Sequence, residues 1–144
     1  MSYTYEYPRP AVTVDCLVFS RENDKLWLML IQRDRPPFQE SWALPGGFVE
    51  IDEDLEEAAY RELKEETGIN DIELGQFRTF GKPGRDPRGR TISIVYYGFT
   101  YNDSNLPQAG SDARNVDWFD VTDLPPLAFD HDKIIEMALQ ELDC

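Results

Sequence analysis

One acidic segment constrains the fold of this chain more than any other part of its sequence. From residue 54 to residue 67 nearly every residue favours a helix, and Gly68 stands where a glycine commonly ends one. Four apolar residues recur there at helical spacing, namely Leu55, Ala58, Ala59 and Leu63. The spacing predicts an amphipathic helix over Asp54–Thr67, and any fold for the chain must bury its apolar side.

Segments that favour β-strands lie on both sides of this helix. The β-branched and apolar runs Ala11–Phe19 and Leu26–Gln32, with polar residues 20–25 between them, predict a hairpin. Trp42–Leu44 is a short extended piece, and Pro45-Gly46-Gly47 is expected to be a sharp turn with positive φ. Later strands are predicted at residues 72–80, 91–101 and 116–119, with loops at 82–89 and 102–110 and a last helix at 134–142.

The order of these elements favours an α/β fold in which a central mixed sheet is covered on both faces by helices. The chain has 144 residues, which predicts a single domain over residues 1–144. No apolar run reaches the ~18 residues of a membrane span, so we expect no membrane partner. Two cysteines, Cys16 and Cys144, form no disulfide framework and favour a reducing cytoplasm.

The net charge also limits the partners of the chain. It is −14, from 28 acidic against 14 basic residues, and such a surface repels a phosphate backbone. Nucleic acid is therefore not an expected partner.

The acidic helix carries more carboxylates than a solvated surface needs. Between residues 53 and 66 there are seven carboxylates and two basic side chains. One interpretation is a solvated helix face. At ~100° per residue, however, Glu62 and Glu66 fall within ~40° of each other, on the side of Leu55 and Ala59 that should face the core. Two inward carboxylates repel each other unless a cation lies between them, and oxygen ligands select a hard ion such as Mg²⁺.

Neighbouring residues of the helix have different expected places. Glu65 lies one residue off the inward face and is a candidate for the metal cluster or for holding a water. Asp54 and Glu57 lie on the far side and are expected to be solvated. Arg61 is expected to brace Glu53 through a bidentate pair near the helix start.

The sequence GFVEIDEDLEEAAYRELKEETGI, read from Gly47, resembles the signature of the Nudix hydrolases. Every fixed position of that signature is met, by Gly47, Glu53, Arg61, Glu62, Leu63, Glu65, Glu66, Gly68 and Ile69. The resemblance implies a Nudix-type α/β/α sandwich that uses Mg²⁺, or Mn²⁺, to hydrolyse a nucleoside diphosphate linked to another group. It implies metal ligands at Glu62, Glu66 and Glu65, with Gly46 offering a carbonyl, and catalytic candidates at Glu65, Glu62, Glu66 and Glu53.

Segments outside the signature bear on the substrate. QRDRPPFQESWALPGGFVE, GRDPRGRTIS, AGSDA and LPPLAFDHDKI resemble the ADP-ribose pyrophosphatases and the ADP-ribose-sensing regulators that share this domain. The resemblance implies hydrolysis of ADP-ribose to AMP and ribose 5-phosphate. One alternative is a non-catalytic ADP-ribose sensor, against which the intact signature and a chain ending without a basic helix-turn-helix both count. The other is a Nudix hydrolase of a nucleoside triphosphate or another nucleotide sugar.

A basic loop is the expected place for an anionic substrate. Residues 78–90 hold five basic side chains and one acid, in a chain of net charge −14. Arg85 and Arg88 on this loop, and Arg33 and Arg35 before the glycine pair, are the substrate-binding candidates. The alternative is that these arginines only pair with surface acids.

Several other residues have an open assignment. Asp112 is a candidate for an additional acid or a loop cap. Base stacking or core packing is open for the aromatic residues Phe38, Phe80, Tyr96 and Trp118. His131 is expected at a helix entry or in a hydrogen bond between elements. Family likeness suggests a homodimer to which the Tyr-rich N-terminus contributes.

Overall fold

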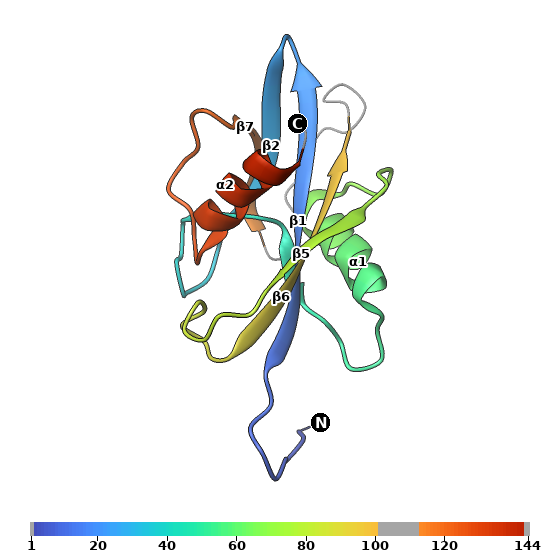
Figure 1. Ribbon diagram of the computed structural model, residues 1–144, viewed down its shortest axis with the longest axis vertical. Coiled ribbons are helices and arrows are strands. Elements are labelled where there is room, and N and C mark those ends of the chain that lie inside the picture. Colours follow the sequence, from blue (N-terminus) through green and yellow to red (C-terminus); the bar gives the residue numbers. More distant parts are fainter. Residues whose placement is uncertain (1, 101–112, 143–144) are drawn as a thin grey trace.

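The computed structural model describes residues 2–100 and 113–142, which form seven strands and two helices (Figure 1). The strands are β1 (Ala11–Glu22), β2 (Lys25–Arg33), β3 (Trp42–Ala43), β4 (Gly46–Phe48), β5 (Gly75–Phe80), β6 (Thr91–Phe99) and β7 (Ala113–Asp120). The helices are α1 (Leu55–Thr67) and α2 (His131–Glu141). Neither of these helices has the length and apolar character that a membrane crossing requires.

The sheet is mixed, as the sequence predicted. Its main order is β3-β2-β1-β6-β5, with β4 added to β1 and β7 added to β2. β1 runs parallel to β6 along its length, from Ala11 opposite Thr91 to Phe19 opposite Phe99, whereas the other described pairs are antiparallel. β1 and β2 pair only near their hairpin tip, and below it β1 takes up β4 while β2 takes up β3 and β7.

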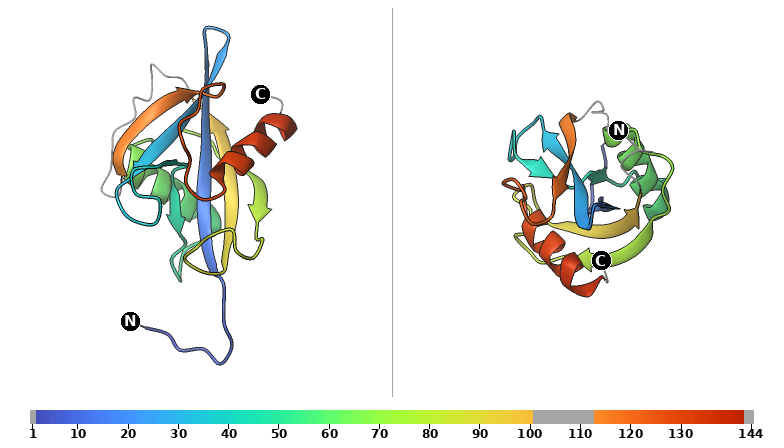
Figure 2. Two further views of the ribbon diagram at one scale, coloured as in Figure 1. Left: turned by 90° about the vertical axis from the view of Figure 1, so that its left-hand side faces the viewer. Right: turned by 90° about the horizontal axis from the view of Figure 1, so that it is seen from above.

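Alternation along β1 divides the core into two layers. Val14, Cys16 and Val18 pack with α1, and Leu17 and Phe19 pack with α2 on the other face. Figure 2 shows the two helices on opposite sides of the strands. The α/β/α arrangement expected from the order of the elements is therefore confirmed.

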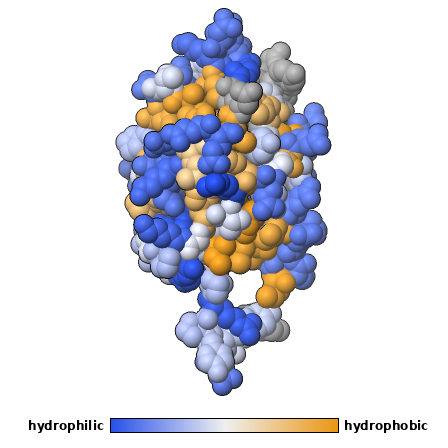
Figure 3. All heavy atoms as spheres, in the orientation of Figure 1, coloured by the Kyte–Doolittle hydropathy of each residue, from blue (hydrophilic) through white to orange (hydrophobic). Residues whose placement is uncertain are grey.

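The first residues of the chain stand apart from this body. Residues 2–10 extend away from it below β1, and the space-filling view shows them as a largely hydrophilic segment (Figures 1 and 3). Tyr3, Tyr5 and Tyr7 are exposed, and Arg9 stacks on Tyr5. Their contribution to a homodimer stays a prediction.

The glycine pair after Pro45 is the main local correction. Gly46 and Gly47 were expected in a turn with positive φ, but both belong to β4, and neither has positive φ. Glycine is needed at both positions because other parts of the chain approach the Gly46 and Gly47 backbone closely. A Cβ on Gly46 would lie 2.1 Å from the Val14 carbonyl oxygen, and one on Gly47 would lie 2.6 Å from the Glu62 carboxylate.

Other boundaries differ by a few residues. The predicted strand over 72–80 begins only at Gly75, and the last helix begins at His131 rather than residue 134. The polar segment 20–25 mostly continues the strands, because Asn23 and Asp24 alone take up the positive φ that closes the hairpin. The predicted loop 102–110 and Asp112 lie outside the described residues.

Candidate active site

Local interactions fix both ends of α1. The Asp54 side chain accepts the Leu55 amide, and the Glu57 side chain reaches back to the Asp54 amide, which makes a capping box. Gly68, at φ 79°, donates its amide to the Lys64 carbonyl and ends the helix as predicted. Asp54 and Glu57, expected to be only solvated, are therefore the residues that start the helix.

Glu62 and Glu66 point inward, as the helical spacing predicted. They are 8% and 4% exposed, respectively, on the side of α1 that faces β4. The Gly46 amide donates to Oε1 of Glu66 at 2.6 Å, and the missing side chain of Gly47 leaves the space that the Glu62 carboxylate fills. The glycine pair therefore shapes a notch for two carboxylates.

Arg61 organises the carboxylates around this notch. Its Nε and Nη2 donate to the two oxygens of Glu53 at 2.5 and 2.9 Å, which confirms the predicted bracing pair. Its Nη1 donates to Glu62 at 2.8 Å and to Glu65 at 3.2 Å. The hydrogen bonds from Arg61 hold the pKa of Glu53 below its usual value. Both oxygens of Glu53 are thus engaged in bracing, a geometry that does not favour a direct catalytic role.

The carboxylate pair fits a hard divalent ion. Magnesium commonly takes one or two protein carboxylates and completes its shell with water and substrate phosphate. Glu62 and Glu66 are one helical turn apart and share one face, which suits this demand. Glu65 is 46% exposed and turned to Arg61, and across residues 2–100 and 113–142 no third acidic, histidine or cysteine side chain joins a metal-holding group. All four predicted ligands, at Glu62, Glu66, Glu65 and Gly46, remain predictions.

The five basic side chains of residues 78–90 do not form one cluster. Arg78 pairs with Glu141, and Arg90 donates to the Gly81 carbonyl. Arg85 is only 6% exposed. Its Nε and Nη2 each donate to Asp130 at 2.8 Å, and its Nη1 donates to Ser93 at 2.7 Å. Arg85 therefore ties the loop to the start of α2, and its guanidinium is already committed, which disfavours the expected grip on substrate.

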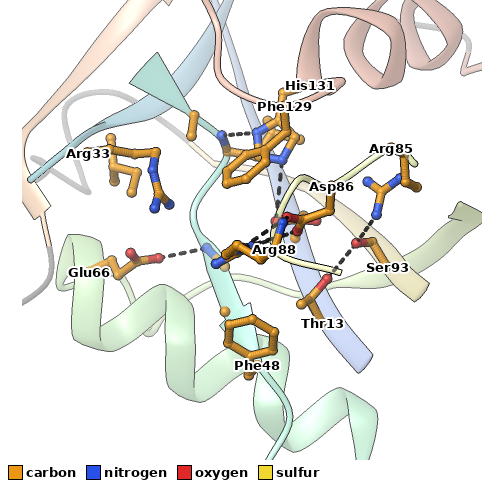
Figure 4. Close-up of a pocket in the computed structure, with 16 residues that line it drawn as sticks. Thr13, Arg33, Phe48, Glu66, Arg85, Asp86, Arg88, Ser93, Phe129 and His131 are labelled. Atoms are coloured by element: carbon orange, nitrogen blue, oxygen red, sulfur yellow. Dashed lines mark hydrogen bonds and ion pairs between the residues drawn. The ribbon is translucent and has the colours of Figure 1, made fainter. Parts of the chain in front are cut away.

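Arg88 and Arg33 do lie at the notch (Figure 4). Arg88 pairs with Asp86 at 2.8 Å and stacks on the rings of Phe48 and Phe129, each 4.8 Å away. Arg33 donates from Nε to the Pro37 carbonyl at 2.8 Å and lies 4.9 Å from the Phe129 ring. Burial, and then the neighbouring charge of Arg88, lower the pKa of Arg33.

Two cavities meet at these residues. The smaller, of about 80 Å³, runs inward past Thr13, Asp15, Ser93 and His131. The larger, of about 390 Å³, opens outward along Asp34, Arg35, Glu50 and Glu62. Both are lined by Ile31, Arg33, Gly46, Gly47, Phe48, Glu66 and Arg88. The Glu66 carboxylate and the guanidinium groups of Arg33 and Arg88 therefore line one junction.

Sequence reasoning missed the polar floor of the smaller cavity. Asp15 lies within the apolar run of β1, and burial raises its pKa to about 7. His131, predicted to bond between elements, accepts the Leu44 amide on Nδ1 at 3.0 Å, and burial lowers its pKa to about 4. The pair is therefore neutral near pH 6, although the groups lie 3.8 Å apart. The available signal was polar Thr13 and Asp15 alternating with apolar residues.

The aromatic candidates mostly belong to the core. Tyr96 and Trp118 pack in the layer under α1, and Phe80 packs in the layer under α2. Phe38 is exposed and tilts onto Phe129, with the ring centres 5.0 Å apart. Phe48, which lines both cavities, and Phe129, which lines the smaller one, were not among the candidates.

A mixed sheet between two helices, with paired carboxylates facing a glycine notch, defines a Nudix-type fold and site. The model of the NUDIX domain matches residues 9–138, and the chain belongs to this family. It is a Nudix pyrophosphohydrolase, and it is similar to an ADP-ribose pyrophosphatase. The ADP-ribose pyrophosphatase of Methanocaldococcus jannaschii is 45% identical over 90% of this chain and 73% of that protein.

This chain is also similar to a transcriptional repressor and to solved structures. The ADPR responsive transcriptional repressor NtrR of Acinetobacter baylyi is 35% identical over 96% of the chain, which spans 56% of that repressor. The NUDIX domain of Shewanella oneidensis NrtR, solved with ADP ribose, superposes with a TM-score of 0.87 at 33% identity, covering 94% of this chain and 90% of that one. A bifunctional NMN adenylyltransferase/ADP ribose pyrophosphatase of Francisella tularensis, solved with AMP and a manganese ion, has a TM-score of 0.80 at 33% identity and covers 95% and 43% of the two chains.

Proposed function

We propose that this chain hydrolyses ADP-ribose to AMP and ribose 5-phosphate with the help of Mg²⁺. The observation that carries the proposal is the junction of the two cavities, where Glu66 of the carboxylate pair and the guanidinium groups of Arg33 and Arg88 line the same space. A diphosphate needs both a divalent ion and cationic side chains around its oxygens. The similarity to an ADP-ribose pyrophosphatase supports the choice of substrate.

The residues of the junction and the neighbouring residues of α1 have different roles. Glu62 and Glu66 would hold the ion, and Arg61 keeps Glu62 in place through its 2.8 Å hydrogen bond. When bound, a divalent ion activates water and neutralises charge on phosphoryl oxygens. Arg33 and Arg88 bind the diphosphate from the opposite side. Glu65, which is close to Arg61 and half exposed, is the proposed base that accepts a proton from the attacking water.

A substrate panel tests this proposal. Purified protein with Mg²⁺ is incubated with ADP-ribose, other nucleotide sugars, dinucleoside polyphosphates and nucleoside triphosphates, and the products are identified. We expect AMP and ribose 5-phosphate from ADP-ribose at the highest kcat/KM, and no product in excess EDTA. A higher kcat/KM for a triphosphate or for another nucleotide sugar would overturn the assignment of ADP-ribose while leaving the reaction type intact.

The similarity to NtrR favours one rival, an ADP-ribose sensor that does not cleave its ligand. Calorimetry separates the two, because a sensor binds ADP-ribose in Mg²⁺ and returns it intact, whereas an enzyme releases AMP over the same period. Recovery of unchanged ADP-ribose after tight binding would establish the sensor.

A further inference from the structure

The geometry points to Arg88 as the arginine that binds a substrate phosphate, and to Asp86, Phe48 and Phe129 as the residues that hold its guanidinium ready for this. The inference rests on the proposed function to the extent that the substrate of the junction carries a phosphate group. It goes further by assigning phosphate binding to Arg88 and not to Arg85, two arginines that the sequence alone does not distinguish.

The hydrogen bonds of the two arginines differ. A guanidinium has five N–H donors in one plane. Arg85 donates from Nε, Nη1 and Nη2 to Asp130 and Ser93, so all three of its nitrogens are occupied in a buried position. Arg88 donates only from Nε and Nη2, both to Asp86. Among residues 2–100 and 113–142 no acceptor forms a hydrogen bond with its Nη1, so one edge is open for an anion.

Three side chains fix the plane of the Arg88 guanidinium. Asp86 holds one edge, while the rings of Phe48 and Phe129 contact the group at 4.8 Å each, and the side chain stays one-third exposed. Figure 4 shows Arg88 between Phe129 above and Phe48 below, with Glu66 across the cavity. A cation held in this way loses little further freedom when it binds, which favours affinity.

Asp86 and Phe129, which position the Arg88 guanidinium, are themselves held in place by other contacts. Asp86 is buried and accepts the Arg88 amide at 2.9 Å, and although burial opposes its charge, the hydrogen bonds from Arg88 keep its pKa below the usual value. Phe129 has a φ of 54°, which bulky residues seldom adopt. The residues that follow it, Asp130 and His131, are tied to Arg85 and Leu44. The ion pair of Arg85 therefore serves to keep Phe129 against Arg88.

An alternative is that Asp86 and Arg88 only shape their own loop, since they are two residues apart. A loop brace would not need Arg88 in the wall of both cavities, or aromatic contacts to Arg88 from two distant segments. The alternative also predicts that Asp86→Asn affects melting and not anion binding.

Calorimetric titration with inorganic pyrophosphate, in parallel with kinetics on ADP-ribose, tests the inference. Lysine keeps the charge of Arg88 but cannot form the bidentate pair, so Arg88→Lys should weaken pyrophosphate binding about ten- to hundredfold and raise KM more than it lowers kcat. Phe129→Leu removes the ring from both Arg88 and Arg33, and it should weaken binding about two- to fivefold for each of these two cation–π contacts. Arg90→Lys, an exposed change in the same loop, is the matched control and should bind and melt like the parent.

Asp86→Asn distinguishes positioning from charge. If Asp86 positions Arg88, the variant binds pyrophosphate more weakly although it has lost a negative charge. If Asp86 only neutralises Arg88, the variant binds more tightly, and that result overturns the inference. So does parent-like binding in Arg88→Lys, or a parent that does not bind pyrophosphate. A parent that binds pyrophosphate but does not cleave ADP-ribose refutes the proposed substrate and leaves the role of Arg88 standing.

Discussion

Gly47→Ala is expected to damage metal binding with little effect on the fold. Gly47 does not have positive φ, so alanine suits its backbone, but the added Cβ would lie 2.6 Å from the Glu62 carboxylate. To regain ordinary contact the carboxylate must move by about 0.8 Å, which exceeds the ~0.5 Å that a preorganised site tolerates. The movement also strains the 2.8 Å hydrogen bond from Arg61. We expect a ten- to hundredfold loss of metal affinity, or about 1.4–2.8 kcal/mol.

Electron paramagnetic resonance of free Mn²⁺ during a titration measures this affinity without relying on turnover, and circular dichroism follows melting. Gly46→Ala is the matched control, because its Cβ would meet the Val14 carbonyl at 2.1 Å, where no flexible side chain can yield. That variant should lose about 1–3 kcal/mol of stability by overpacking. Parent-like Mn²⁺ affinity in Gly47→Ala, or a loss of stability that equals that of Gly46→Ala, would refute the reasoning.

Three further outcomes are expected. Glu66→Gln keeps the size of the side chain and removes its charge, so hydrolysis should fall by at least ~10²-fold, and full activity would sink the metal assignment. Arg61→Ala should lower melting temperature and activity together, whereas Glu65→Gln should lower kcat alone; an inactive Arg61→Ala that melts like the parent would show that Arg61 acts on substrate. Between pH 4 and 6.5, the raised pKa of Asp15 makes stability fall with rising pH, and the lowered pKa of His131 makes it rise. Asp15→Asn removes the first effect, so its melting temperature should climb more steeply with pH than that of the parent, and equal slopes would contradict this.

The parts of the site that depend on local periodicity were predictable from the sequence. The ends of α1, the inward direction of Glu62 and Glu66 and the pair of Arg61 with Glu53 all involve residues of one helix or those just before it, and the structure confirms them. The mixed sheet followed from the order of strands around the helices.

The parts that depend on distant partners were not predictable. A Pro-Gly-Gly sequence suits a turn as well as a strand that passes close to another element, and only the position of Glu62 decides between them. Arg85 and Arg88 have similar surroundings in sequence, and the difference lies in Asp130, which is 45 residues from Arg85. Asp15 lies in an apolar run, and the residues that face it across the cavity come from other segments. The sequence around Asp15 therefore did not reveal its place in the site.

Local contacts stabilise α1, whereas the cavity that Arg88 lines is built from segments far apart in the sequence. This difference predicts an order of folding. α1 carries its own caps, whereas the hydrogen bonds between the Thr13 and Ser93 hydroxyls and from the Leu44 amide to His131 close loops of 80 and 87 residues. Long loops close late because their entropic cost precedes any gain from contacts. In pulsed hydrogen exchange during refolding, we expect amides of α1 to gain protection before the Leu44 amide does. The refolding chain would then form its acidic helix before it forms the cavity that binds an anion.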